Sequence, residues 1–250
     1  MELKGKVCLV TGGTSGIGSA VALEYGRRGA SLCIVGYDKT PDNAVDVQRR
    51  IEACGQKCLV LNEDLADPAR AAHCVELTVR TFGCLDVLVH CAGGAARGSL
   101  LDVTPDTWYS AFDIHVHSAF HLARAAVPHM RKRGEGAILL ISSAAGARGC
   151  AGAIAYGVAK GVIPPFTRSL ARELADFNIR VNCVSPGIIR TPFQDYLTPE
   201  QVRNNIENRI PLHREGTPQD VAQALVMLTE NEFITGADLA IDGGMTMRMV

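Results

Sequence analysis

Short runs of Val, Ile and Leu alternate along the chain with longer segments in which apolar residues recur at helical spacing. Parallel strands buried on both faces give such continuous apolar runs, and crossover helices have one apolar face. The pattern therefore predicts one doubly wound α/β domain, a parallel sheet of about seven strands with helices on both faces. The predicted strands are 6–11, 31–36, 58–62, 85–91, 136–142, 179–184 and 238–241. The predicted helices are 16–28, 41–54, 67–82, 105–132, 153–177 and 218–230, with a further one at 199–208.

Composition narrows the class of protein without changing this picture. Of 250 residues, 47% are apolar and 20% charged, with a net charge of −1. This provides a large core and no bulk attraction to nucleic acid or an anionic membrane. No apolar run reaches the roughly 20 residues that span a bilayer, and no secretion signal precedes the first strand. We therefore expect residues 1–250 to form a single cytoplasmic domain.

Nine cysteines raise the alternatives of disulfides or a metal site. Their number is odd, none forms a Cys-x-x-Cys pair, and several lie in apolar runs such as VCLV and LCIV. Disulfide frameworks and zinc sites have other spacings, so we expect reduced thiols that are mostly buried.

A glycine-rich turn, TGGTSGIG at residues 11–18, follows the first predicted strand and precedes a helix. Its glycines at 12, 16 and 18 allow a tight turn, a close approach to a pyrophosphate, and packing of the helix on the strand. The helix N-terminus then offers N–H groups to the anion. Taken alone, the turn is also compatible with a purely structural role or with another nucleotide-like ligand, such as a methyl donor.

Further motifs follow the turn in order: DL at 64–65, AG at 92–93, SS at 142–143, Tyr156-x-x-x-Lys160, and SPGIIRTP at 185–192. Together with the turn, they are similar to the motifs of the short-chain dehydrogenase/reductase family over about residues 5–244. The resemblance implies a Rossmann-like fold and an NAD(P)-dependent oxidoreductase that forms a homodimer or homotetramer.

Tyr156 and Lys160 are spaced to share one face of a helix. A free tyrosine has a pKa near 10, and the charge of Lys160 is expected to lower it. The resemblance implies that Tyr156 is the general acid/base, that Lys160 also holds the nicotinamide ribose, and that Ser143 hydrogen-bonds the substrate oxygen. The predicted reaction is hydride exchange between a nicotinamide and a carbonyl or alcohol carbon, without a metal.

The resemblance also implies which residues hold the cofactor. Ile189 and Thr191 would anchor the nicotinamide carboxamide, and Asp64 and Leu65 would border the adenine. The other predicted cofactor residues are Gly12, Thr14, Ser15, Gly16, Ile17, Gly18, Asp38, Cys91, Ala92, Gly93, Pro186 and Gly187, together with Tyr156 and Lys160.

Two histidines depart from the family pattern. HCAG at 90–93 replaces Asn-Asn-Ala-Gly, so we expect the contacts of an asparagine side chain to be lost and backbone contacts to survive. His115 stands where the family has a fourth catalytic residue, an asparagine that organises a water beside the lysine. Histidine can bind water and titrate near neutrality, so it would keep or retune this relay. His115, His117 and His121 could instead bind a metal, but no carboxylate or cysteine completes the set, and we predict none.

Pro164 and Pro165 fall inside the helix that carries Tyr156. Each removes an N–H donor and clashes with the preceding turn, at a cost of about 3 kcal/mol or more in a regular helix. We expect a kink or a local break, with the carbonyl of Lys160 left free. In members of the family this helix packs between subunits, which leaves the oligomeric state open.

The cofactor is predicted to be NAD rather than NADP. Gly36 replaces the acidic residue of NAD-preferring members, but Asp38 would repel a 2′-phosphate, and no arginine is present at position 15 or 37. A substrate lid is expected at 193–215, and its amides and charges favour a small polar substrate such as a sugar, polyol or hydroxy acid.

Two alternatives to this function stay open. One is a 3-oxoacyl-[acyl-carrier-protein] reductase, for which RKR at 131–133 is present, although ADFN at 175–178 is not basic. The other is a nucleotide-binding regulator with weak catalysis. The intact set of Ser143, Tyr156 and Lys160 favours an enzyme, because a protein that only binds has no need of it.

Overall fold

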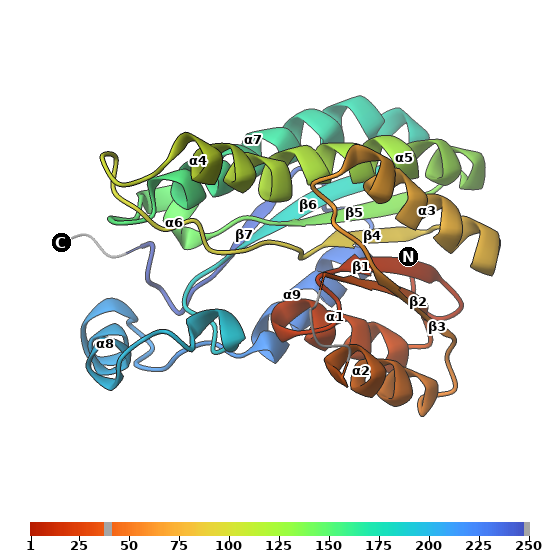
Figure 1. Ribbon diagram of the computed structural model, residues 1–250. Helices are drawn as coiled ribbons and strands as arrows, with labels where there is room; N and C mark the ends of the chain where they lie inside the picture. Colours follow the sequence, from red (N-terminus) through yellow and green to blue (C-terminus); the bar gives the residue numbers. More distant parts are fainter. Residues whose placement is uncertain (38–41, 248–250) are drawn as a thin grey trace.

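A computed structural model describes residues 1–37 and 42–247 (Figure 1). In this part of the chain the strands form one parallel sheet in the order β3-β2-β1-β4-β5-β6-β7. The doubly wound fold and the positions of the predicted strands are confirmed. The strands are β1 (Val7–Thr11), β2 (Ser31–Gly36), β3 (Cys58–Asn62), β4 (Val87–His90), β5 (Gly136–Ile141), β6 (Ile179–Pro186) and β7 (Asp238–Ile241).

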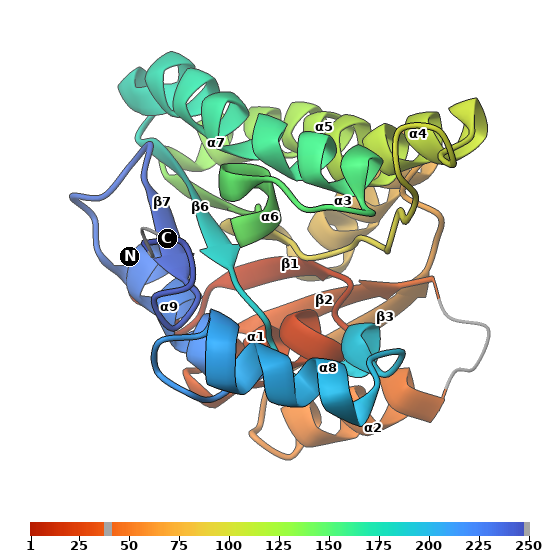
Figure 2. The same cartoon turned by 90° about the vertical axis from the view of Figure 1, so that its left-hand side faces the viewer.

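Helices cover both faces of the sheet (Figures 1 and 2). One face carries α1 (Gly16–Arg27), α2 (Asp42–Glu52) and α9 (Pro218–Glu230). The other carries α3 (Pro68–Phe82), α4 (Pro105–Phe112), α5 (Ser118–Arg133) and α7 (Ile154–Leu174). The short helices α6 (Ala144–Arg148) and α8 (Pro199–Asn204) lie at the end of the molecule where the strands finish.

Each face of the sheet has its own hydrophobic core, because neighbouring residues of a strand point to opposite faces. Val10 of β1 packs in the core that contains Val21 of α1, whereas Leu9 packs with Leu122 of α5 and Ile163 of α7. All five residues of β1 are buried. This two-sided burial explains the continuous apolar runs in the sequence.

The order of the strands fixes where a ligand can bind. β1 pairs with β2 on one side and β4 on the other, so the connections leave β1 and β4 in opposite directions. Such a switch point opens a crevice at the carboxyl ends of the strands. Thr11 and His90 lie side by side at this end, and the glycine-rich turn begins there.

Two helical regions differ from the prediction. The predicted helix 105–132 is divided into α4 and α5 by a wider, π-helical turn at Asp113–His117, a feature often found at functional sites. In contrast, α7 runs without interruption through Pro164 and Pro165, so the predicted local break is wrong, while the alternative of a kink stays a prediction. The hydroxyl of Ser142 donates a 2.9 Å hydrogen bond to the carbonyl of Lys160, and so supplies the partner that Pro164 removes.

The cysteine prediction is correct in part. All nine are free thiols; Cys8, Cys33, Cys74 and Cys183 are buried, but Cys54 and Cys150 are exposed. Within residues 1–37 and 42–247, none of the helices combines the length and the apolar character that a bilayer crossing demands.

Candidate functional site

The turn between β1 and α1 is built for close approach of backbones. Gly12 has a φ of +63°, and a Cβ on it would lie 2.9 Å from the amide nitrogen of Ala92. A Cβ on Gly18 would overlap the carbonyl oxygen of Gly12. Ser15 precedes α1 but makes no side-chain capping bond, so the N–H groups of the first helical turn lack a side-chain cap. They are thus available to a phosphate group.

A cavity of about 710 Å³ lies beyond the ends of β2 and β3. Thr14, Gly36, Asp64 and Leu65 line it, and the ring of Tyr37 is 74% exposed beside them. The lining also includes Glu63 and Asp106, whereas its described residues include no lysine or arginine. The predicted cofactor residue Asp38 lies outside the described residues.

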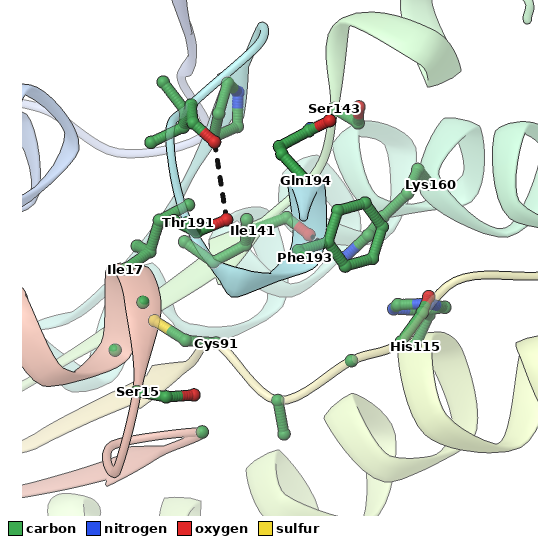
Figure 3. Close-up of a pocket in the computed structure, with 18 of the residues that line it drawn as sticks. Ser15, Ile17, Cys91, His115, Ile141, Ser143, Lys160, Thr191, Phe193 and Gln194 are labelled. Atoms are coloured by element: carbon green, nitrogen blue, oxygen red, sulfur yellow. Dashed lines mark hydrogen bonds between the residues drawn. The ribbon is translucent and has the colours of Figure 1, made fainter. Parts of the chain in front are cut away.

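A second cavity, of about 210 Å³, shares part of its wall with the first and reaches the ends of β4, β5 and β6 (Figure 3). Thr191 lies against Gly16, 3.4 Å from where a Cβ of that glycine would be. The structure therefore brings together most of the predicted cofactor residues. Those that line this cavity are Gly12, Ser15, Gly16, Ile17, Gly18, Cys91, Ala92, Gly93, Tyr156, Lys160, Pro186, Gly187, Ile189 and Thr191.

Ser143, Tyr156 and Lys160 converge at this second cavity. Ser143 follows β5, where its Oγ accepts a 3.1 Å hydrogen bond from the amide of Ala145, and its side chain lies close enough to Tyr156 to affect the pKa of the phenol. The Nζ of Lys160 lies 5.9 Å from the centre of the Tyr156 ring and donates a 2.9 Å bond to the carbonyl of Ile141. The predicted triad is therefore one constellation in space.

Burial controls the protonation of this triad. Burial raises the pKa of Tyr156, and the neighbouring Ser143 hydroxyl lowers it by less. Burial also lowers the pKa of Lys160 to about 8. Desolvation outweighs the other influences on the phenol, and the ammonium of Lys160 donates to the Ile141 carbonyl, so the lowering of the Tyr156 pKa by Lys160 stays a prediction.

His115 lies in the π-helical turn, 2% exposed, with its ring edge-on to Tyr156 at 5.4 Å between centroids. Its Nε2 is 3.0 Å from the carbonyl oxygen of Gly94, which can only accept, so Nε2 carries the proton. Its Nδ1 has no hydrogen-bond partner among the described residues. Burial, and then the charge of Lys160, hold the pKa of His115 well below its usual range. The prediction of titration near neutrality is therefore wrong, and His115 is a neutral acceptor beside the triad.

His90 replaces the contacts of the expected asparagine with contacts of its own. Its Nδ1 lies 2.8 Å from the hydroxyl of Thr11, and its Nε2 lies 3.0 Å from the hydroxyl of Ser118. Ser118 donates to the carbonyl of Ile114, so it accepts from Nε2–H. Burial lowers the pKa of His90 to about 3. The neutral ring thus ties β1 and β4 to the first turn of α5 with contacts of its own, and the loss of the contacts of an asparagine side chain stays a prediction.

The cluster of His115, His117 and His121 does not form a metal centre in the structure. His117 bonds the carboxylate of Asp113 through Nδ1, 2.8 Å away, while the Nε2 of His115 is taken by Gly94. Nowhere in the described part of the chain do three His, Cys, Asp or Glu side chains converge as metal ligands would.

A third cavity, of about 810 Å³, lies on the other side of Ser143 and Tyr156. Segment 193–215 forms much of its wall, and Phe193 and Gln194 line both this cavity and the second one. The ring of Phe193 is 6.0 Å from that of Tyr156. Sequence reasoning missed several lining residues outside that segment, although Arg97 follows β4 at the carboxyl edge, where ligands bind. They are Arg97, Arg148, Cys150, Met245 and Thr246.

Comparisons with known proteins cover nearly the whole chain. A family model described as Enoyl-(Acyl carrier protein) reductase matches residues 12–246. The chain is 34% identical over 249 residues to 3-oxoacyl-[acyl-carrier-protein] reductase FabG of Thermotoga maritima, with 99% of this chain and 100% of the relative covered. It is 36% identical over 256 residues to Versicolorin reductase 1 of Aspergillus parasiticus, with 97% of each covered. A solved short-chain type dehydrogenase/reductase from Mycobacterium ulcerans is similar with a TM-score of 0.93 and 30% identity, over 99% of this chain and 92% of that one.

Proposed function

The chain belongs to the short-chain dehydrogenase/reductase family, and from that premise we propose that it interconverts a small polar alcohol and its ketone with Tyr156 as general acid/base. It is an NAD(P)-dependent oxidoreductase. One observation carries the proposal: Ser143 and Tyr156 line both the cavity of the predicted cofactor residues and the large cavity beside it. A substrate seated in the large cavity would meet the cofactor at these two hydroxyls.

The first two cavities fit a dinucleotide. We propose that the uncapped amides of α1 hold the pyrophosphate, that Asp64 and Leu65 border the adenine, and that Ile189 and Thr191 hold the carboxamide. Lys160 would hold the nicotinamide ribose. When bound, the nicotinamide supplies or accepts the hydride.

The protonation states of the triad support a general acid. In the reduction direction, the carbonyl carbon gains a hydride, and the Tyr156 phenol gives its proton to the carbonyl oxygen as negative charge grows there. Ser143 donates a hydrogen bond to the same oxygen, since its own Oγ already accepts from Ala145. The raised pKa of Tyr156 keeps the phenol protonated until that moment.

The proton lost by Tyr156 must be replaced from solvent. We propose that Lys160 and His115 carry this relay through water, because the free Nδ1 of His115 is a buried acceptor in the wall of both cofactor cavities. The neutral imidazole accepts a hydrogen bond as the amide oxygen of an asparagine would. His115 therefore keeps the function of the residue that it replaces.

We propose NAD as the preferred cofactor. Glu63, Asp64 and Asp106 line the adenosine cavity without a described lysine or arginine among the lining residues, but Glu63 is paired with Arg70 at 3.4 Å, so Asp64 and Asp106 carry the argument. A 2′-phosphate placed there would be repelled by these carboxylates, whereas a 2′-hydroxyl could donate to them.

A 3-oxoacyl-[acyl-carrier-protein] reductase is the second candidate, favoured by the identity to the Thermotoga maritima protein of that name. The basic run at 131–133 does not favour it. Arg131 stacks on the ring of Phe177 at 3.7 Å, and Arg133 pairs with the buried Asp86 at 3.2 Å. Two of the three side chains are thus engaged within the chain itself. We place free small substrates first.

Two further proposals concern shape and assembly. We propose that segment 193–215 acts as the substrate lid, because it lines the large cavity and reaches Tyr156 through Phe193. We also propose a homodimer or homotetramer, since the uninterrupted α7 leaves a regular surface for packing between subunits. Light scattering on the purified protein would measure the assembly.

The test of the function is oxidation of NADH or NADPH, followed by absorbance near 340 nm, over a panel of ketones, sugars, keto acids and an acyl-carrier thioester. We expect turnover of a free carbonyl compound with NADH. Turnover restricted to the thioester would establish the second candidate. Cofactor binding without turnover of any compound would contradict both and favour a regulator.

A further inference from the structure

The large cavity beside Tyr156 has an unbalanced charge. Three arginines line it, Arg97, Arg148 and Arg209, and no aspartate or glutamate does so among the described residues. The chain as a whole is nearly neutral, with a net charge of −1. The positive lining is therefore local to this cavity.

Each of the three arginines comes from a different element. Arg97 follows β4, Arg148 is in the last turn of α6, and Arg209 ends the helical part of the proposed lid. All three side chains are exposed, but they come from three separate elements and line one cavity, so their positive charge is concentrated there. Ser143 and Tyr156 belong to the same wall, so the arginines and the reacting hydroxyls face one space.

Two of these guanidinium groups are already held in place. That of Arg97 lies 3.4 Å above the centre of the Tyr196 ring. That of Arg209 donates a 2.8 Å bond to the side-chain oxygen of Asn205, a residue only 3% exposed. The ion pairs that other arginines make within the described chain do not include these three. Their remaining N–H donors are therefore free to bind an anion.

We infer that the substrate is a keto acid, or the corresponding hydroxy acid, whose carboxylate is bound by Arg97, Arg148 and Arg209 while its carbonyl lies at Ser143 and Tyr156. The inference rests on the proposed function and narrows its polar substrate to an anionic one. A planar guanidinium matches a carboxylate with two parallel hydrogen bonds. Apolar residues of the same wall, Ile188, Leu197 and Met245, take the carbon chain between the two groups.

The first experiment compares each member of a series of keto acids with its own methyl ester and with the keto phosphate of equal length. The spacing between carbonyl and anion increases along the series. We expect kcat/KM for the best acid to exceed that of its ester about tenfold or more, because hydrogen bonds to charged groups are the strong ones. Its KM should rise with salt, since salt screens exposed charges.

The outcomes separate the inference from the proposed function. Equal kcat/KM for acid and ester overturns the inference and leaves the oxidoreductase proposal in place. No turnover of any carbonyl compound overturns the proposed function. A phosphate that is a better substrate than the carboxylate overturns the choice of carboxylate, and turnover of the acyl-carrier thioester alone would assign the arginines to protein docking instead.

The second experiment uses Arg148→Gln, which removes a charge without breaking a bond that the described chain makes. We expect the preference for the acid over the ester to fall several-fold, mainly through KM. The matched control is Arg203→Gln on α8, an exposed arginine of the same lid that is not among the residues lining the cavity. An equal loss of preference in both variants would contradict a specific site.

A binding measurement completes the test without turnover. A carboxylic acid with a methylene in place of the carbonyl should raise the melting temperature of the wild type and of Arg203→Gln. It should raise that of Arg148→Gln less. Equal shifts in all three proteins would overturn the inference, and the melting temperatures without ligand report whether each variant is folded.

Discussion

The hydroxyl of Ser142 donates a hydrogen bond to the carbonyl oxygen of Lys160 at 2.9 Å, and this side-chain bond stands in for the backbone bond that Pro164 removes. Both groups are buried, so an unpaired carbonyl here would be costly. Because the bond is made, α7 continues through both prolines, and Tyr156 and Lys160 stay on one helical face. We propose that the second serine of the SS motif, Ser143, bonds the substrate, while the first, Ser142, bonds the helix that carries Tyr156.

Removing that hydroxyl should therefore destabilise the protein. Ser142→Ala leaves the Lys160 carbonyl without a partner, and we expect the free energy of unfolding in urea to fall by about 1–3 kcal/mol. The control is the same substitution in a Pro164→Ala background, where residue 164 again carries an N–H. The loss should be smaller there, as a double-mutant cycle would report. Equal losses in both backgrounds would mean that the two features are independent.

Tyr156→Phe keeps the ring and the helix but removes the proton donor. We expect kcat to fall by about 10²–10⁴-fold, with little change in the Kd for NADH, because positioned acid/base groups contribute in that range. Lys160→Ala should lose both kcat and cofactor affinity, since that side chain serves the ribose as well as the relay. A Tyr156→Phe protein with near-native kcat would disprove the mechanism and make His115 the next candidate for the acid/base group.

Position 115 should tolerate asparagine, the residue that the family has there, better than an apolar residue. His115→Asn retains a buried acceptor, so we expect kcat within several-fold of the wild type. His115→Leu removes the acceptor, and kcat should fall by more than tenfold, as general acid/base relays lose their proton path. Since the pKa of His115 is held well below its usual range, no ionisation near pH 6.5 should appear in the kcat profile. An inflection there that His115→Asn abolishes would disprove the neutral ring.

His90 makes the fold sensitive to acid. Its pKa is about 3 in the folded protein and near 6.5 in the unfolded chain, so between these values the unfolded state binds one more proton. The free energy of unfolding should therefore rise with pH in this window and fall on acidification, by about 1.4 kcal/mol per pH unit from this group alone. In His90→Asn, the free energy of unfolding measured in urea at pH 5, 6 and 7 should rise less steeply with pH than in the wild type. If the free energy of unfolding depends on pH equally in both proteins, His90 does not stay neutral in the folded state.

Lys160 should give cofactor binding a pH dependence of its own. Its pKa is lowered to about 8, so the ammonium form that would bond the ribose is lost as the pH rises through that value. We expect the Kd for NADH to increase above pH 8 in the wild type. In Lys160→Gln, whose side chain does not titrate, the Kd for NADH should be higher and should not change with pH. Parallel profiles for the two proteins would rule out a role for the charge.

What could be predicted from the sequence depended on local patterns. The strand VCLVT is apolar at nearly every position because both of its faces are buried, and that signal needs no knowledge of the rest of the chain. The glycine-rich turn and the Tyr156–Lys160 spacing are likewise short-range. These features gave the sheet and most of the residues of the cofactor cavities.

The features that the sequence did not predict depend on contacts between residues distant in sequence. His90 is satisfied by Thr11, 79 residues away, and α7 continues because of Ser142, 18 residues before Lys160. The π-helical turn at His115 is too short for a periodic pattern to distinguish from an α-helix. The three arginines of the large cavity lie on elements that meet only in the folded chain. Local rules carry no information on any of these contacts.

Phe193 and Gln194 form a wall shared by two cavities, the one that we propose holds the nicotinamide and the one that we propose holds the substrate. A substitution in this shared wall that admits a new substrate should therefore also change the affinity for the nicotinamide cofactor. Selection for a new substrate specificity will change cofactor affinity as well, so variants at these two positions should be tested for both. Specificity could be altered with more independence from the opposite wall, at Arg148 or Met245, which line the substrate's side alone.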